Sequence, residues 1–313
     1  MKENIFGKDI NACEALMTEL GEAKYRGKQL YQWLYQKRCE NFSEMTNFSS
    51  ALREKLDGQY IEAVLMHYEH GASLCVSTQV GCNMGCKFCA STRGGKIRDL
   101  TAGEILAQIY LAEKDENLRI SNVVIMGIGE PLENYDAVIK FIRIANTGFG
   151  IGQRKISLST CGIIPGIEAL AEENLQINLA ISLHSVFAER RKQLMPIANR
   201  YDFEPLMEAC RAYFKKTGRR ITYEYALIDG YNDRDEDITG LIKLLKGSQN
   251  HLNLIGLNEV QETPYKESPR LSYILGVLEK NGVNVTMRRK MGRDIDAACG
   301  QLRKKRYKDK VSL

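Results

Sequence analysis

The chain has 313 residues, 44% of them hydrophobic, which is enough to bury a substantial core in one large domain or in a large and a small one. Its net charge of +5, from 44 basic and 39 acidic residues, is mild. Its polar, charged N-terminus predicts no secretory signal, and no apolar run approaches the roughly eighteen residues of a membrane span. We therefore expect a reducing cytoplasm, where clustered cysteines serve metal binding or catalysis rather than disulfides.

The first part of the chain is predicted to be helical. Across residues 8–56, apolar side chains recur at helical spacing, as in Cys13 and Met17 and again in Leu30 and Leu34. The spacing predicts a small helical accessory domain over residues 1–60. Its basic residues suit a face that binds nucleic acid, and they are Lys24, Arg26, Lys28, Lys37 and Arg38.

Residues 61–300 alternate between predicted strands and helices. A strand over 61–66 and another over 73–80 come first, and a capping box from Thr101 to Glu104 opens a helix that ends near residue 113. Alternating apolar strands and helices are typical of a parallel sheet covered by helices, and six or so units indicate an α/β fold with a partial (β/α)6 barrel. The further strands are expected at 122–126, 155–159, 177–182, 220–227, 251–257 and 283–288, and the further helices at 135–145, 165–174, 203–216, 235–246 and 269–281.

Three cysteines stand in a C-x3-C-x2-C motif at Cys82, Cys86 and Cys89, directly after an early strand. Three thiolates can hold three corners of a cubane iron–sulfur cluster and leave the fourth iron open to a cofactor. A closed zinc site needs a fourth Cys or His nearby, and the next downstream His is His184. The motif favours an iron–sulfur cluster, with a zinc site and ordinary reduced thiols as the alternatives.

Polar or glycine-rich signatures follow several predicted strands. Each alone is typical of a tight turn, but the C-terminal ends of parallel strands meet at one edge, where ligands bind. Together they predict one shared pocket beside the cysteines. The signatures are Gly127 to Pro131, Ser159 to Gly162, Ser182 to Ser185, and Asn258.

The last segment, residues 301–313, is expected to be a basic tail. Between Arg303 and Lys310 it has six cations and one anion. Such a run suits a phosphate backbone, and a solvated tail is an equal alternative.

The cysteine motif and the Gly-Glu-Pro sequence at Gly129 to Pro131 resemble those of radical S-adenosylmethionine (SAM) enzymes. The segments from Cys75 to Cys82 and from Asp294 to Leu302 are more specific, and they resemble the RlmN/Cfr family of radical SAM RNA methyltransferases. The resemblance extends over nearly the whole chain from Leu20 onward.

The resemblance implies methylation of C2 of an adenosine in 23S ribosomal RNA and in some tRNAs. It implies a 4Fe–4S cluster on the three motif cysteines, two SAM molecules per turnover, an electron donor such as flavodoxin or ferredoxin, and a monomer. Cys299 would be S-methylated by the first SAM, Cys75 would resolve the covalent RNA adduct through a transient disulfide with Cys299, and Glu62 would accept a proton. The SAM-contacting positions would be Gly129, Glu130, Ser159, Ser182, Leu183, His184 and Asn258.

Several alternatives stay open. A Cfr-type enzyme methylates C8 of the same nucleotide, although Val80 and Pro131 are atypical of that group. A non-catalytic RNA-binding module with a vestigial cluster and a zinc-binding RNA protein are further alternatives. The segment before Glu62 is shorter than in relatives, which leaves the RNA target open. The other cysteines are interpreted as core thiols, although Cys161 falls in the expected SAM pocket; they are Cys13, Cys39, Cys161 and Cys210.

Overall fold

The computed structural model describes the chain in several stretches, which are residues 8–37, 44–49, 52, 61–68, 71–258, 260 and 263–288. The described stretches up to residue 52 belong to one compact unit and those from Ile61 onward to another, and each unit is described by itself. Within these stretches, no helix combines the length and apolar character that crossing a membrane requires.

The smaller unit contains helix α1 (Ile10–Glu19), helix α2 (Arg26–Tyr31) and a π-helical turn (Gln32–Gln36). Asp9 begins α1 because its side chain accepts a hydrogen bond from the amide of Ala12, at 2.8 Å, which satisfies a donor in the first turn. The predicted apolar positions are buried against one another, as expected for a helical pair. This core contains Cys13, Met17, Leu30, Leu34, Met45, Phe48 and Leu52.

The larger unit is built on an eight-stranded sheet with the order β1-β2-β5-β6-β7-β8-β9-β10. Strand β1 runs antiparallel to β2, and every other neighbouring pair is parallel. The strands are β1 (Val64–Tyr68), β2 (Gly71–Cys75), β5 (Ile120–Ile125), β6 (Ile156–Thr160), β7 (Asn178–Ser182), β8 (Ile221–Leu227), β9 (His251–Gly256) and β10 (Val285–Met287).

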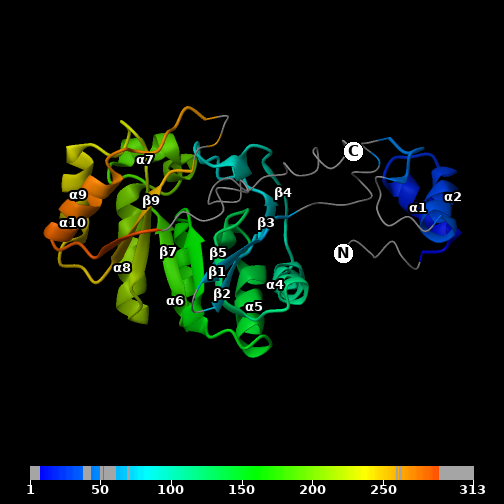
Figure 1. The fold of residues 1–313 in the computed structure, drawn as a ribbon, viewed down its shortest axis with the longest axis horizontal. Coiled ribbons are helices and arrows are strands. Elements are labelled where there is room, and N and C mark those ends of the chain that lie inside the picture. The colour runs from blue at the N-terminus through cyan, green and yellow to red at the C-terminus, as the bar shows by residue number, and fades with distance from the viewer. Residues whose placement is uncertain are drawn as a thin grey trace. The chain divides into compact units, whose positions relative to one another are not determined.

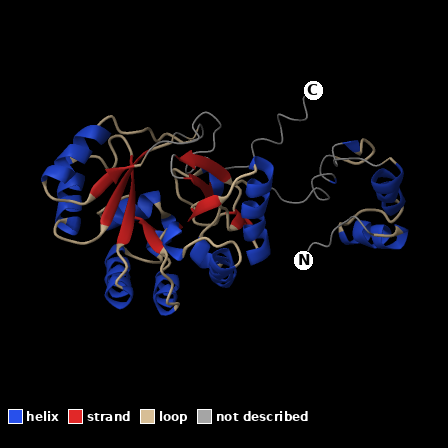
Figure 2. Ribbon diagram, turned by 60° about the horizontal axis from the view of Figure 1, so that its bottom comes forward, coloured by secondary structure: helices blue, strands red, loops and turns tan. Residues whose placement is uncertain are grey.

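Helices follow the parallel strands, and the ribbon views show them outside a curled, open sheet (Figures 1 and 2). The predicted capping box is present, since Thr101 and Glu104 exchange hydrogen bonds at the start of α4. The predicted partial barrel is confirmed, with β10 as an added parallel edge strand. The helices are α4 (Ala102–Glu116), α5 (Tyr135–Thr147), α6 (Ile164–Glu172), α7 (Ala188–Leu194), α8 (Phe203–Thr217), α9 (Asp235–Leu245) and α10 (Leu271–Lys280).

The strand predicted over 73–80 is two strands in the structure. Strand β2 ends at Cys75, and after a short break β3 (Gln79–Gly81) pairs with β4 (Lys96–Asp99) in a separate hairpin. The break is stabilised by a side chain, since the amide of Ser77 donates to Gln108 Oε1 and its carbonyl accepts from Gln108 Nε2, both at 2.9 Å. The sequence missed this exchange because it joins positions 31 residues apart.

Candidate active site

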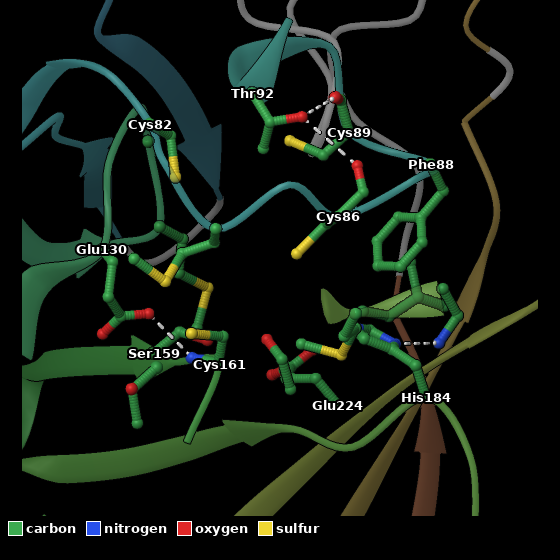
Figure 3. Close-up of a pocket in the computed structure, with 18 of the residues that line it drawn as sticks. Cys82, Cys86, Phe88, Cys89, Thr92, Glu130, Ser159, Cys161, His184 and Glu224 are labelled. Carbon is green, nitrogen blue, oxygen red and sulfur yellow. Dashed lines mark hydrogen bonds between the residues drawn. The ribbon is translucent and has the colours of Figure 1, made fainter. Parts of the chain in front are cut away.

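One cavity of about 170 Å³ opens at the C-terminal ends of the parallel strands (Figure 3). All three motif cysteines line it, together with most of the polar residues predicted to meet there. The predicted lining residues found in this cavity are Cys82, Cys86, Cys89, Gly129, Glu130, Ser159, Ser182, His184 and Asn258.

The cysteine loop is closed by the β3–β4 hairpin. The amide of Cys82 donates to the carbonyl of Gly95 at 3.2 Å, and Thr92 Oγ1 lies 3.3 and 3.1 Å from the carbonyls of Cys86 and Cys89. Gly81 adopts a φ of +76°, and a Cβ there would lie only 1.9 Å from the carbonyl oxygen of Gly95. The loop is therefore held in one shape by its own backbone and by the Thr92 side chain.

The three motif thiols line one cavity and suit a cubane iron–sulfur cluster. Across the described part of the chain, no three Cys, His, Asp or Glu side chains converge as ligands of one metal ion. A cubane cluster instead binds each thiolate to a different iron, so its cysteines stay apart. Burial raises the pKa of Cys82 to about 12 and that of Cys86 well above its ordinary value, so these thiolates need a nearby positive charge such as iron.

Glu130 places a buried carboxylate at the cavity. Its Oε1 accepts from the amide of Leu132 at 3.0 Å and its Oε2 from the amide of Cys161 at 2.8 Å. Burial raises its pKa, and these two hydrogen bonds counteract that effect. The adjacent Gly129 has a φ of +109°, and a Cβ on it would lie 2.6 Å from Cβ of Gln79. Only glycine fits there, so the backbone beside Glu130 stays accessible.

His184 contributes a neutral imidazole. Its Nδ1 accepts from the amide of Ala226 at 3.0 Å, so the proton resides on Nε2. Burial, with a smaller effect of Arg191, lowers its pKa to about 3. The ring meets Phe88 edge to face at 4.8 Å. His184 can thus donate one hydrogen bond without carrying a charge.

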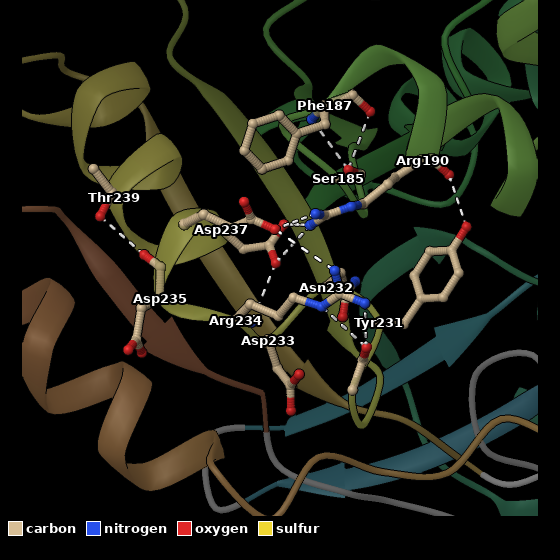
Figure 4. A network of polar contacts seen from close by, with 12 residues as sticks. Ser185, Phe187, Arg190, Tyr231, Asn232, Asp233, Arg234, Asp235, Asp237 and Thr239 are labelled. Carbon is tan, nitrogen blue, oxygen red and sulfur yellow. Dashed lines mark hydrogen bonds and ion pairs between the residues drawn. The ribbon is translucent and has the colours of Figure 1, made fainter.

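The backbone of His184 is braced by the loop after β8. His184 has a φ of +53°, which is uncommon for a residue with a side chain. The buried Asn232 donates from Nδ2 to the carbonyls of His184 and Ala226, at 2.7 and 2.8 Å, and its Oδ1 accepts from the amide of Ile228 at 2.7 Å. Figure 4 shows Asn232 within the surrounding polar network.

Some predicted site residues lie elsewhere. Leu183 is fully buried in the core rather than lining the cavity, and its amide donates to the carbonyl of Glu224 at 2.9 Å. Cys75 is buried at the end of β2 in a small apolar cluster. Met126 packs against this cluster and also lines the cavity. The carbonyl of Glu62 accepts a hydrogen bond at 2.6 Å from Oγ of Ser77, which lies shortly beyond β2.

Cys299, the basic tail and the segment just before Ile61 lie outside the described residues. No disulfide joins the cysteines that the structure describes to one another. Among these, Cys13 and Cys210 are core thiols as predicted, whereas Cys161 lines the cavity as well as being buried.

Glu224 was missed by the sequence analysis. It is a buried carboxylate on β8 that lines the cavity, accepting from Asn253 Nδ2 at 3.0 Å and lying 3.6 Å from Arg288 Nη1. The available signal was an acidic residue in the middle of a mostly apolar predicted strand. Such a carboxylate is rarely buried without a partner or a ligand.

Comparison with known proteins agrees with this geometry. Residues 76–242 match the model of the radical SAM superfamily, and residues 3–61 match a ribosomal RNA large subunit methyltransferase N-terminal domain. A protein of Lachnospira eligens, named as a probable dual-specificity RNA methyltransferase RlmN, is 49% identical over 96% of this chain and 97% of its own length. A protein of the same name from Clostridium perfringens is 46% identical over 98% of this chain and 99% of its own length.

The chain belongs to the RlmN family of radical SAM proteins. A crystal structure of a radical SAM methyltransferase from Sphaerobacter thermophilus resembles it with a TM-score of 0.76 and 36% identity, covering 96% of this chain and 98% of that one. RlmN membership thus agrees with the curled sheet and with the place of the cysteine loop at its strand ends.

Proposed function

We propose that this chain methylates C2 of an adenosine in 23S ribosomal RNA and in tRNA. The relatives named as dual-specificity RNA methyltransferases support this reaction class, because they align with nearly the whole chain. The observation that carries the proposal is the convergence of Cys82, Cys86 and Cys89 with buried polar side chains on one cavity. A cavity built this way suits a charged cofactor bound beside a metal cluster.

In this proposal Cys82, Cys86 and Cys89 hold a 4Fe–4S cluster and leave one iron for SAM. When bound, the reduced cluster supplies the electron that cleaves SAM, which is chemistry that protein side chains cannot provide. The hairpin around the cysteines limits the access of water, since Cys82 is only 6% exposed.

The strand ends bind and orient SAM. The carboxylate of Glu130 faces its amino group, with both oxygens already aligned by backbone amides. His184 donates from Nε2, and Ser159, Ser182 and Asn258 supply further polar contacts at the cavity wall. Gly129 lets the backbone approach the cofactor. Leu183 is buried, so it acts through its backbone in holding neighbouring strands together.

Two cysteines carry the methyl group and release the product. Cys299 Sγ receives a methyl from one SAM. The second SAM is used to transfer the carbon of that methyl group from Cys299 to adenine C2. The Cys75 thiolate then attacks Cys299 Sγ, the bond between that sulfur and the transferred carbon breaks with its electron pair left on the carbon, the carbon takes a proton to become the methyl group, and a Cys75–Cys299 disulfide forms. Glu62 accepts the proton that leaves C2. An external thiol restores the two cysteines for the next turnover.

The test is to reconstitute the full chain anaerobically, incubate it with 23S ribosomal RNA and with tRNA, and identify the methylated nucleoside by mass spectrometry. We expect 2-methyladenosine. A product of 8-methyladenosine would contradict the C2 assignment and indicate Cfr-type chemistry, and an iron-free protein would contradict the cluster.

Two variants test the cysteine roles. Cys299→Ala should give no methylated RNA, and Cys75→Ala should accumulate RNA covalently attached to the protein, visible on a denaturing gel. Cys210→Ala is the matched control, because Cys210 is a buried thiol on α8 away from the cavity. Free turnover by Cys75→Ala without an adduct would refute the resolving role.

A further inference from the structure

Arg191 is a fully buried arginine that holds three strand-end carbonyls. It lies on α7, and 0% of it is exposed to solvent. One acceptor follows β6 and the other two lie at the end of β7 and just after it, so a single guanidinium joins the ends of two neighbouring strands. Nη2 donates to the carbonyls of Cys161 at 2.7 Å and Ser182 at 3.1 Å, and Nε donates to the carbonyl of Leu183 at 3.2 Å.

Within the described residues no carboxylate bonds to Arg191, and Asp202, which is paired with Lys192, acts on its charge less than three thiols do. Its bonds go to neutral carbonyls, and its Nη1 is buried without a hydrogen-bond partner there. A buried cation without a counter-ion is costly, so proteins rarely keep one unless a ligand balances it. The neighbours that interact most strongly with the charge of Arg191 are thiols, foremost Cys161 and the motif cysteine Cys86, and these two line the same cavity.

We propose that Arg191 is a positioning residue whose positive charge favours the reduced form of the cluster held by Cys82, Cys86 and Cys89. This inference rests on the proposed function, because it requires the cluster. One-electron reduction adds one negative charge to the cluster and no proton. In a buried site of low dielectric, a nearby fixed cation stabilises the more negative form and raises the reduction potential.

The guanidinium therefore has two separable effects. Its hydrogen bonds fix the strand ends that carry Ser182 and Cys161, and its charge acts on the cluster. Arg191→Gln removes the charge and keeps a donor. Arg191→Lys keeps the charge and loses the planar fork that reaches several carbonyls at once.

The experiment is a redox titration of the reconstituted full-length protein with dithionite, followed by the electron paramagnetic resonance signal of the reduced cluster. We expect Arg191→Gln to lower the equilibrium constant for reduction at least about tenfold, which is about 59 mV for one electron. Arg191→Lys should stay within about threefold of the wild type. The matched control is Lys192→Gln, because Lys192 is the adjacent cation on the same helix but is paired with Glu189 and Asp202 near the surface.

The outcomes are distinct. Equal potentials in Arg191→Gln and the wild type would overturn the inference, and so would the same fall in Lys192→Gln. If Arg191→Gln does not fold, Arg191→Lys decides: a retained potential supports the charge effect, and a tenfold fall refutes it, since the charge is still present. Failure of the wild type to bind iron and sulfide would instead overturn the proposed function itself.

Discussion

Lowering the pH tests how completely the folded protein shields the His184 ring from water. The pKa of this imidazole is about 3 against an ordinary value of 6.5, chiefly because of burial. Below pH 6.5 the unfolded chain binds a proton at this position and the folded chain does not. The stability contributed by the neutral ring is therefore complete above pH 6.5 and is lost progressively as the pH falls towards 3. At pH 5 the loss is about 2 kcal/mol, from about 1.5 pH units at 1.36 kcal/mol each.

Two measurements check this value. In protein labelled in its imidazole rings, the NMR signals of His184 should not move between pH 8 and pH 5. The chain has four histidines, so His184→Gln assigns the signal by its disappearance. In denaturant unfolding of the larger unit, the wild type should lose about 2 kcal/mol relative to His184→Gln between pH 7 and pH 5.

A His184 signal that titrates near pH 6.5 would refute the argument, because it would mean that water reaches the ring. Equal pH dependence of the wild type and His184→Gln would refute the stability calculation. Either result would also undermine the assignment of the Nε2 proton, which depends on Nδ1 accepting from the amide of Ala226.

Three further substitutions test the cavity wall. Glu130→Gln replaces an oxygen that accepts a hydrogen bond from a backbone amide by an NH2 group that donates one. Equilibrium dialysis should show SAM binding weakened by about 10- to 100-fold, because the charge is lost and hydrogen bonding loses about 1–3 kcal/mol. Gly129→Ala forces a Cβ against Gln79 at a positive φ and should lower the stability by about 1–3 kcal/mol in thermal unfolding. Asn232→Asp places a carboxylate against two carbonyls and should destabilise the fold by about 3 kcal/mol while shifting the NMR signals of His184.

Each substitution has a matched control. Glu173→Gln removes a carboxylate that forms an ion pair with Arg143, a residue distant from it in the sequence. This change should leave SAM binding unchanged. Gly152→Ala adds a methyl where no other atom lies within 4 Å and where φ is −57°. Asn199→Asp alters an exposed amide with a single local bond. Effects of equal size in a variant and its control would contradict the specific contacts described above.

Much of the larger unit could be predicted because its signals are local. The capping box at Thr101 marks the start of α4, and apolar runs mark the parallel strands. The rule that ligands bind at the C-terminal ends of parallel strands then predicts a cavity shared by residues as distant as Glu130 and Asn258. It works because the parallel register brings these ends to one edge, whatever lies between them in the chain.

The missed features depend on long-range contacts. Gln108 ends the early strand by bonding Ser77 across 31 residues, which no local pattern reveals. The SAM contact that the resemblance implies for Leu183 stays a prediction, and its side chain is buried in the core between two residues that line the cavity. Helix α7, which carries Arg191, is only seven residues long and is not among the helices that the sequence predicts.

Burial of the charged groups around the cavity lowers the stability of the protein when no ligand is bound. Glu130 and Glu224 are 3% and 2% exposed, and Arg191 is fully buried. Within the described residues, the hydrogen-bond partners of Glu130 and Arg191 are uncharged backbone and side-chain groups, so neither residue neutralises the other. A ligand with a matching set of charges offsets such a cost, and SAM carries an amino group, a carboxylate and a sulfonium. The same burial that weakens the empty protein therefore favours a small charged cofactor over an apolar one, and this selectivity comes from the cavity wall, independently of the three cysteines.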